Sequence, residues 1–230
     1  MHRREEIMTY LSEEEKASVV ARYLERYAKH GIHVDALKSG GAAKQHIRHI
    51  VHASMFDLKN KHVLDVGCGI GMFYEYLKSL PNQIASYTGL DIVEPFLEYD
   101  RAQFPEARFD NVDIFLDPLD AYTPDIVFMS QVFNNKYENT DNEEIAKEAM
   151  RRFFGIAKVG IAIDFMTSYV DYNEEGLHYF SPEMMFTFAK SLTRTVALRH
   201  DYVPFEFTLF LYKQPTFDLD EISAKITSKK

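Results

Sequence analysis

The feature that most constrains the fold is the stretch from Val63 to Phe73, which reads VLDVGCGIGMF. Apolar residues at strand spacing run into Gly67, Gly69 and Gly71, and residues that suit the start of a helix follow. Such a unit brings bare backbone N–H groups and a helix N-terminus close to a ligand. Only glycine permits this approach, because a Cβ would occupy the ligand's space or forbid the required φ. The stretch therefore predicts a ligand-binding turn after the first strand of a parallel α/β sheet.

The glycine spacing distinguishes two kinds of cofactor. A dinucleotide fingerprint needs its third glycine where this chain has Met72, whereas the pattern present is Asp-x-Gly-x-Gly-x-Gly, beginning at Asp65. A second apolar strand ends in Asp91, about 20 residues after the glycines, which leaves room for one helix and a return strand. An acid there can accept hydrogen bonds from both hydroxyls of a ribose. Together these features indicate a nucleoside-containing cofactor and disfavour a dinucleotide.

At these residues the chain resembles the class I S-adenosylmethionine (SAM)-dependent methyltransferases, whose first motif reads almost letter for letter as here. The resemblance covers about residues 62–213 and implies SAM as cofactor, S-adenosylhomocysteine as product and no metal. It also implies a Rossmann-like α/β fold, with a mainly parallel seven-stranded sheet that ends in an antiparallel hairpin and helices on both faces. Residues 1–61 would form an N-terminal helical lid, 62–213 the SAM-binding core and 214–230 a polar tail, within one structural domain.

The resemblance implies a role for the acids near the strand ends. Asp65 orders the glycine loop and faces the methionine part of SAM, and Asp91 binds the ribose. Asp113 is the best match for the acid that binds the adenine amino group, with Asp110 and Asp117 as competitors. The residues expected to contact the cofactor are Asp65, Gly67, Cys68, Gly69, Gly71, Asp91, Ile92, Asp113, Ile114, Ser130, Gln131 and Arg48.

Periodicity predicts the elements without reference to the family. Strands are expected at 62–66, 86–91, 107–112, 126–130, 159–165, 195–200 and 205–212, and helices at 12–30, from about 42, and at 70–79, 95–104, 142–157 and 182–192. Strands that alternate with helices imply right-handed crossovers and a mainly parallel sheet. The turn at 201–204 is short, so the last two strands must be antiparallel. The polar residues of the helix from about 42 are expected to form mainly a solvated face.

Composition restricts the partners and the surroundings of the protein. The 230 residues include 35 acidic and 26 basic ones, for a formal net charge of −9, which argues against nucleic acid as a partner. The single cysteine, Cys68, excludes an intramolecular disulfide and a cysteine zinc cluster. His46, His49 and His52 repeat every three residues, but no carboxylate partner is apparent in the sequence, so no metal site is expected. Without a secretory signal or membrane-length apolar run, we expect a cytoplasmic protein that does not enter membranes.

The acceptor is expected at loops that follow the fourth and fifth strands. In the family, the loop that begins at Ser130 runs past the methionine end of SAM to the methyl acceptor, and here it lacks the Asp/Asn-Pro-Pro-Tyr sequence of enzymes that methylate nucleobases. The loop before the helix at 182–192 is about fifteen residues long, and long loops tend to be functional. The candidate substrate-binding residues are Asn134, Tyr137, Tyr169, Tyr172 and His178.

Methyl transfer from a sulfonium is an in-line displacement, and alignment of the acceptor with the methyl carbon can lower the barrier by ~7–11 kcal/mol. A base is needed only where the acceptor loses a proton, as a hydroxyl does. His200 beside Asp201, after the sixth strand, is the candidate for an oriented general base, because imidazole titrates near neutrality. The same two residues also fit plain turn polarity at a strand end.

The resulting hypothesis is a SAM-dependent methyltransferase that acts on a small-molecule acceptor at oxygen. Three alternatives stay open: a catalytically inactive SAM-binding or regulatory protein of the same fold, an N-methyltransferase for a small amine, and an NAD-dependent oxidoreductase. Met72 stands against the last. The sequence does not identify the acceptor, the atom methylated or the oligomeric state.

Overall fold

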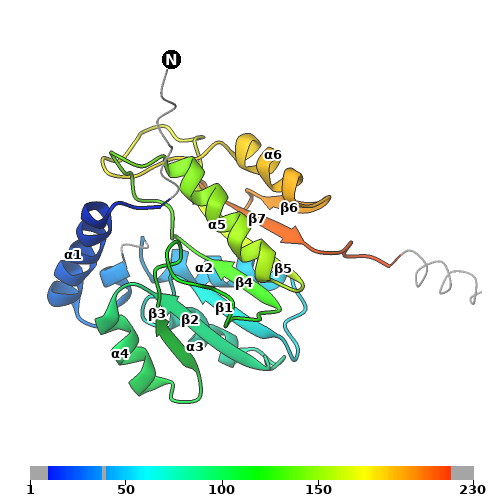
Figure 1. Cartoon of the computed structure of the whole chain (residues 1–230), viewed down its shortest axis with the longest axis horizontal. Helices are drawn as coiled ribbons and strands as arrows, with labels where there is room; N and C mark the ends of the chain where they lie inside the picture. Colours follow the sequence, from blue (N-terminus) through cyan, green and yellow to red (C-terminus); the bar gives the residue numbers. More distant parts are fainter. Residues whose placement is uncertain (1–9, 38–39, 219–230) are drawn as a thin grey trace, which may run out of the picture.

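A single seven-stranded sheet organises the chain in the computed structural model, which describes residues 10–37 and 40–218. The strand order is β3-β2-β1-β4-β5-β7-β6, so the direction of winding reverses between β1 and β4 (Figure 1). The strands are β1 His62–Val66, β2 Ser86–Asp91, β3 Arg108–Asn111, β4 Ile126–Met129, β5 Gly160–Met166, β6 Thr195–Arg199 and β7 Glu206–Tyr212. Ligands of such sheets bind beyond the carboxyl ends of the strands, near the reversal point.

Strand pairing confirms the expected mixed sheet. Strands β1 to β5 pair in parallel with their neighbours, and β7 pairs antiparallel with both β5 and β6. Strand β6 therefore runs in the same direction as β1 to β5 and ends at the same edge of the sheet. The antiparallel hairpin formed by β6 and β7 closes one side of the sheet, as expected.

Helices cover both faces of the sheet because each strand alternates its side chains between two apolar layers. In β4, Val127 and Met129 belong to the layer under α5 and α6, whereas Ile126 and Phe128 belong to the layer under α2 and α3. Figure 1 shows α5 in front of the sheet and α3 behind it. The helices are α1 Glu13–His30, α2 Ala42–Ser54, α3 Met72–Ser79, α4 Glu94–Gln103, α5 Asn142–Ile156, α6 Pro182–Leu192 and the short 3₁₀ helix η1 Val34–Leu37.

The helix starts show how local chemistry sets these boundaries. The Ser12 hydroxyl accepts a hydrogen bond from the Glu15 N–H, and the Glu15 carboxylate accepts one from the Ser12 N–H, which forms a capping box at the start of α1. Asp141 caps α5 through the N–H groups of Glu143 and Glu144. Asp141 and Glu144 have capping-box spacing, but the Glu144 carboxylate accepts a hydrogen bond from Lys147.

The two N-terminal helices have different positions, although the sequence suggested one lid. Helix α2 packs on the sheet, and its buried residues include His49 and His52, so the expectation of a mainly solvated polar face was wrong for these residues. Helix α1 instead packs against the start of α4, where the rings of Tyr23 and Tyr27 both make T-shaped contacts with Phe96. Within 10–37 and 40–218, no helix is long and apolar enough to cross a membrane. The end of the expected tail, 219–230, lies outside the described residues.

Candidate functional site

The glycine loop after β1 has the backbone geometry that its sequence predicts. Gly67 and Gly69 have φ angles of +74° and +60°. A Cβ on Gly67 would lie 2.8 Å from Val132, and one on Gly69 would lie 2.9 Å from Leu37. Both contacts are too short, so only glycine fits these two positions. The loop backbone therefore forms a floor for a cavity, called here the first cavity, at the carboxyl ends of β1 to β4.

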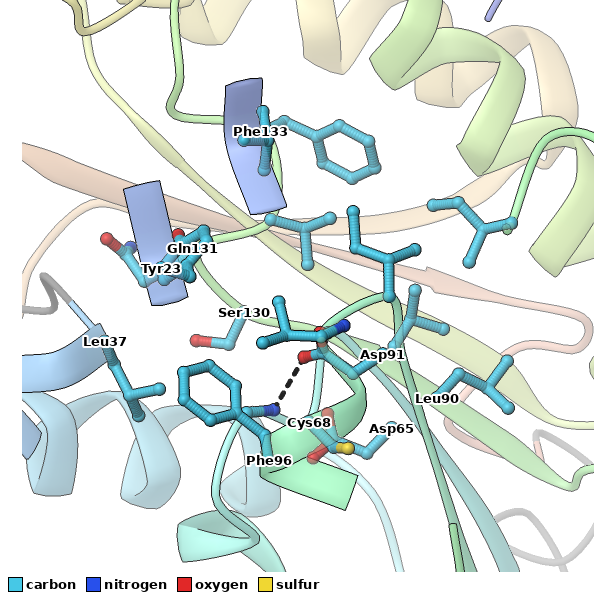
Figure 2. A pocket seen from close by; sticks show the side chains of 18 of the residues that line it. Tyr23, Leu37, Asp65, Cys68, Leu90, Asp91, Phe96, Ser130, Gln131 and Phe133 are labelled. Atoms are coloured by element: carbon cyan, nitrogen blue, oxygen red, sulfur yellow. Dashed lines mark hydrogen bonds between the residues drawn. The ribbon is translucent and has the colours of Figure 1, made fainter. Parts of the chain in front are cut away.

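Asp91 connects the end of β2 to this loop. Its Oδ2 accepts a hydrogen bond of 2.9 Å from the Gly69 N–H (Figure 2). Its Oδ1 accepts one of 2.9 Å from the Val93 N–H. Burial raises the pKa of Asp91, and these two hydrogen bonds partly counteract the increase. The carboxylate faces the first cavity, where it can also accept hydrogen bonds from ligand hydroxyls.

Two further carboxyl groups lie close to the same loop. Asp65 accepts a hydrogen bond of 2.5 Å from the Tyr87 hydroxyl, and burial raises the pKa of Asp65 to about 6. Asp100 lies beneath the loop, 4.0 Å from the Cys68 sulfur, and burial raises its pKa to about 8. No lysine or arginine among the described residues forms a salt bridge with Asp65, Asp91 or Asp100. Asp65 and Asp91 line the first cavity, so their carboxylates favour a ligand that carries positive charge, whereas Asp100 is mainly protonated near neutral pH.

Asp113 is the acid after β3 that reaches the first cavity. Its Oδ1 accepts from the Phe115 N–H at 3.0 Å, and its Oδ2 lies 3.1 Å from the Lys16 ammonium. Neither Asp110 nor Asp117 lines this cavity. Of the three acids that compete in the sequence, the structure brings Asp113 alone to the cavity.

Helix α1 lies across the first cavity, and its side chains bind residues after β3 on one side and after β4 on the other. Lys16 pairs with Asp113 after β3, as described above. On the other side, Glu15 accepts a hydrogen bond of 3.0 Å from the Asn139 N–H, and Arg22 donates one of 2.8 Å to the Asn135 side chain. Tyr23 of α1 and Leu37 of η1 line the cavity beside Phe96 (Figure 2). This cover encloses the ligand-binding region on the side away from the sheet.

The structure gathers most of the residues that were expected to contact the cofactor. Those that line the first cavity are Asp65, Gly67, Cys68, Gly69, Asp91, Ile92, Asp113, Ile114, Ser130 and Gln131. Gly71 precedes α3 as its N-cap and is not in the lining. Sequence reasoning missed the contributions of Tyr23, Phe96 and His49. Burial lowers the pKa of His49 to about 3, so this imidazole is neutral.

Arg48 does not line the first cavity, in contrast to the sequence expectation. Its side chain is 2% exposed, and its Nε donates a hydrogen bond of 2.6 Å to Oε2 of Glu206, at the start of β7. A buried guanidinium needs a buried counter-charge, and Glu206 supplies it. This pair lies at the wall of a second cavity, which adjoins the first.

The second cavity shares four lining residues with the first and takes its other walls from the N-terminal segment 26–48 and from the loops after β4, β5 and β6. The shared residues are Tyr23, Leu37, Gln131 and Asn135. Of the candidate substrate-binding residues, Asn134 and Tyr172 line the second cavity, whereas Tyr137 lines the first. Tyr169 and His178 line neither.

His200 and Asp201 lie at the carboxyl edge of the sheet, as expected, but they do not form an oriented pair. Asp201 accepts two hydrogen bonds from Arg199, at 2.9 and 3.0 Å. His200 contacts the rings of Tyr169 and Phe207. Neither residue lines either cavity, since β6 is the edge strand of the sheet and β7 separates it from β5.

Asp164, near the end of β5, is a site residue that the sequence analysis did not identify. It is completely buried, and its carboxylate binds Ser130 and Gln131, which line the first cavity. His52 of α2 lies 2.9 Å from the same carboxylate, so one of the three repeated histidines does have a carboxylate partner. Among the described residues, no group of three or more potential metal ligands is present. The sequence feature that could have identified Asp164 is its position as the one acid inside the apolar strand GIAIDFM.

Comparison with known proteins agrees with this site. A family model described as a methyltransferase domain matches residues 63–153. The chain is 28% identical over 154 residues to Rv1506c of Mycobacterium tuberculosis, whose name includes the word methyltransferase, and the match covers 65% of this chain and 91% of that protein.

Solved structures share the fold at low sequence identity. Magnesium protoporphyrin IX methyltransferase from Synechocystis, with bound S-adenosylhomocysteine, has a TM-score of 0.61 at 11% identity, covering 86% of this chain and 95% of that one. Phosphoethanolamine N-methyltransferase 1 from Haemonchus contortus has a TM-score of 0.63 at 12% identity, covering 92% and 53%.

The fold and the first cavity thus define a nucleoside-binding α/β protein whose ligand lies over a glycine loop. The methyltransferase-domain match over residues 63–153, the relative and the shared fold support a class I SAM-dependent methyltransferase, with methyl transfer from SAM as its activity. The acids around the loop then meet a cofactor that carries a positive sulfonium.

Proposed function

We propose that the protein transfers the methyl group of SAM to an oxygen atom of a small molecule bound in the second cavity. The observation that carries this proposal is the continuity of the two cavities through Tyr23, Leu37, Gln131 and Asn135. An acceptor in the second cavity would reach the cofactor at these four residues. The enzyme's main contribution would be alignment of the two reactants.

The walls of the second cavity support a small, polar acceptor. Amide groups come from Gln131, Asn134 and Asn135, and the Arg48–Glu206 pair adds a buried charged wall. Tyr172 and Tyr179 add aromatic surface. A hydroxyl-bearing molecule can donate to and accept from such groups. The net charge of −9 further disfavours a nucleic acid acceptor.

The proposal gives no base role to His200, which lies outside both cavities. Such a role would need a rearrangement that brings the edge strand β6 toward Gln131. Alignment, together with exclusion of water by α1, accounts for the chemistry that we assign to this chain.

A screen for S-adenosylhomocysteine release tests the proposal, with panels of small hydroxyl-bearing and amine-bearing compounds. We expect turnover with a hydroxyl compound. Turnover with amines alone would favour the N-methyltransferase alternative, and cofactor binding without turnover would favour the inactive binding protein.

Two tyrosines provide a matched pair of variants for the second cavity. Tyr172 lines it and is 62% exposed, whereas Tyr169 is 61% exposed and lines neither cavity. We expect Tyr172→Ala to raise KM for the acceptor at least about fivefold with unchanged cofactor affinity, and Tyr169→Ala to have no effect. Equal effects of both substitutions would place the acceptor elsewhere.

A further inference from the structure

Gln131 has an unusual backbone conformation at the boundary of the two cavities. Its φ is +61°, in the left-handed region that glutamine rarely adopts. Asn60, with φ +57°, is the other described non-glycine residue in this region, but asparagine tolerates it well and Asn60 lines neither cavity. Strained backbone of this kind persists only where its surroundings hold it, and it concentrates at functional sites.

The surroundings hold both the backbone and the side chain of Gln131. Oδ1 of Asp164 accepts a hydrogen bond of 2.8 Å from the Gln131 backbone N–H and one of 2.9 Å from its side-chain Nε2. The side-chain Oε1 accepts a third bond, of 2.8 Å, from Asn134. The amide is thus fixed in one orientation, and each of its polar atoms keeps one further hydrogen-bonding direction for a ligand.

The other carboxylate oxygen of Asp164 is held by Ser130, the residue before Gln131, and by His52 of α2. Its Oδ2 lies 2.6 Å from the Ser130 hydroxyl and 2.9 Å from Nε2 of His52. Burial alone would raise the pKa of Asp164, but these hydrogen bonds and nearby positive charge outweigh burial and lower the pKa. The carboxylate therefore stays ionised and accepts all four hydrogen bonds. His52 itself lines neither cavity.

The sheet order indicates which end of the cofactor meets Gln131. Asp113 and Asp91 follow β3 and β2, the glycine loop follows β1, and Gln131 follows β4. These four points lie in sequence along one edge of the sheet. With the ribose at Asp91, a ligand that extends along the edge places its nucleoside toward β3 and its amino-acid end toward β4.

We propose that His52, Asp164 and Gln131 form a clamp that positions the amino-acid end of the cofactor against the acceptor. Gln131 contacts the ligand, whereas Asp164 and His52 are positioning residues that act through it. The role on the acceptor side rests on the proposed function of the second cavity. The strained backbone is retained because it directs the amide into the boundary between the two ligands.

Ligand binding to four variants tests the clamp, by calorimetry with S-adenosylhomocysteine and with 5′-methylthioadenosine, which lacks the amino-acid end. We expect Gln131→Gly to weaken S-adenosylhomocysteine binding about tenfold, the size of one hydrogen bond to a charged group. Binding of 5′-methylthioadenosine should change less than about twofold. Asn60→Gly, which relieves the same backbone conformation away from the site, should leave both affinities unchanged.

Substitutions of His52, which lines neither cavity, test whether this residue affects ligand binding through Asp164. We expect His52→Leu, which removes the donor to Asp164, to weaken S-adenosylhomocysteine binding selectively. His52→Gln, which retains an N–H at that place, should restore it. Thermal melts of each variant confirm that the binding measurements refer to folded protein.

The results separate the clamp from the cofactor assignment. Wild-type protein that binds neither ligand would overturn the assignment of the first cavity. Wild-type binding that Gln131→Gly leaves unchanged, or an equal loss for both ligands in His52→Leu and His52→Gln, would overturn the clamp alone.

Discussion

Replacement of Asp100 by asparagine should make the protein more stable, and the gain should grow with pH. Asp100 is completely buried beneath the glycine loop, and its Oδ1 has no hydrogen-bond partner. Burial, followed by the charges of Asp91 and Asp65, raises its pKa from 3.8 to about 8. In the unfolded chain the same carboxyl group ionises near 3.8.

The sign and size of the effect follow from proton linkage. Below about pH 4 both states are protonated, and Asp100 has no influence on the pH dependence. Between about pH 4 and pH 8 the unfolded state alone loses the proton, so the free energy of unfolding falls by up to about 1.4 kcal/mol per pH unit. Above about pH 8 the loss levels off. Since asparagine does not titrate, the advantage of Asp100→Asn should grow by about 2–4 kcal/mol between pH 5 and pH 8.

Urea denaturation at pH 5, 6.5 and 8 measures this difference. The exposed Asp171, converted to asparagine, is the matched control, and its curves should stay parallel to those of the wild type. An advantage of Asp100→Asn that is independent of pH would show that the carboxyl group is ionised in the folded protein. The account of the acids beneath the glycine loop would then be wrong.

Three further substitutions test the first cavity, and a fourth, Gly155→Ala, is a control away from it. Asp91→Ala should weaken S-adenosylhomocysteine binding at least about a hundredfold, measured by calorimetry, because the glycine loop loses its carboxylate partner. Gly69→Ala should destabilise the fold by about 1–3 kcal/mol in urea denaturation, since the φ of Gly69 is +60°. Gly155→Ala should stabilise the fold by about 0.5–1 kcal/mol in the same assay, because Gly155 lies in the last turn of α5 with open space around its Cα. Lys16→Met removes the pair with Asp113 and should change stability by less than about 1 kcal/mol but increase the rate of cofactor release in stopped-flow measurements.

The parts of the fold and site that could be predicted from the sequence are those that local chemistry determines. The alternation of apolar residues predicts the strands, and the glycines and Asp91 follow their strands directly, so their meeting at one edge follows from topology. Helix η1 was not expected, because four residues are too few for a periodic pattern. Its Leu37 nevertheless lines both cavities.

Side-chain pairs between distant elements could not be predicted in this way. Arg48 meets Glu206 and His52 meets Asp164 only because α2 packs beneath β5 and β7. Adjacent residues in the sequence do not always interact, as His200 and Asp201 show. Asp201, in the bend after β6, binds Arg199 and not the adjacent His200.

The first and second cavities also differ in how far the family match covers them. The methyltransferase-domain match covers residues 63–153, and most residues that line the first cavity lie within it. The second cavity takes many of its walls from outside the match: Arg26 and Lys44 before it, and the loops 166–181 and 203–206 after it. Cofactor binding therefore depends on the part of the chain that resembles other methyltransferases. With the acceptor in the second cavity, as proposed above, its choice would depend largely on segments that this match does not include, so substitutions there should change which molecule is methylated and leave SAM binding intact.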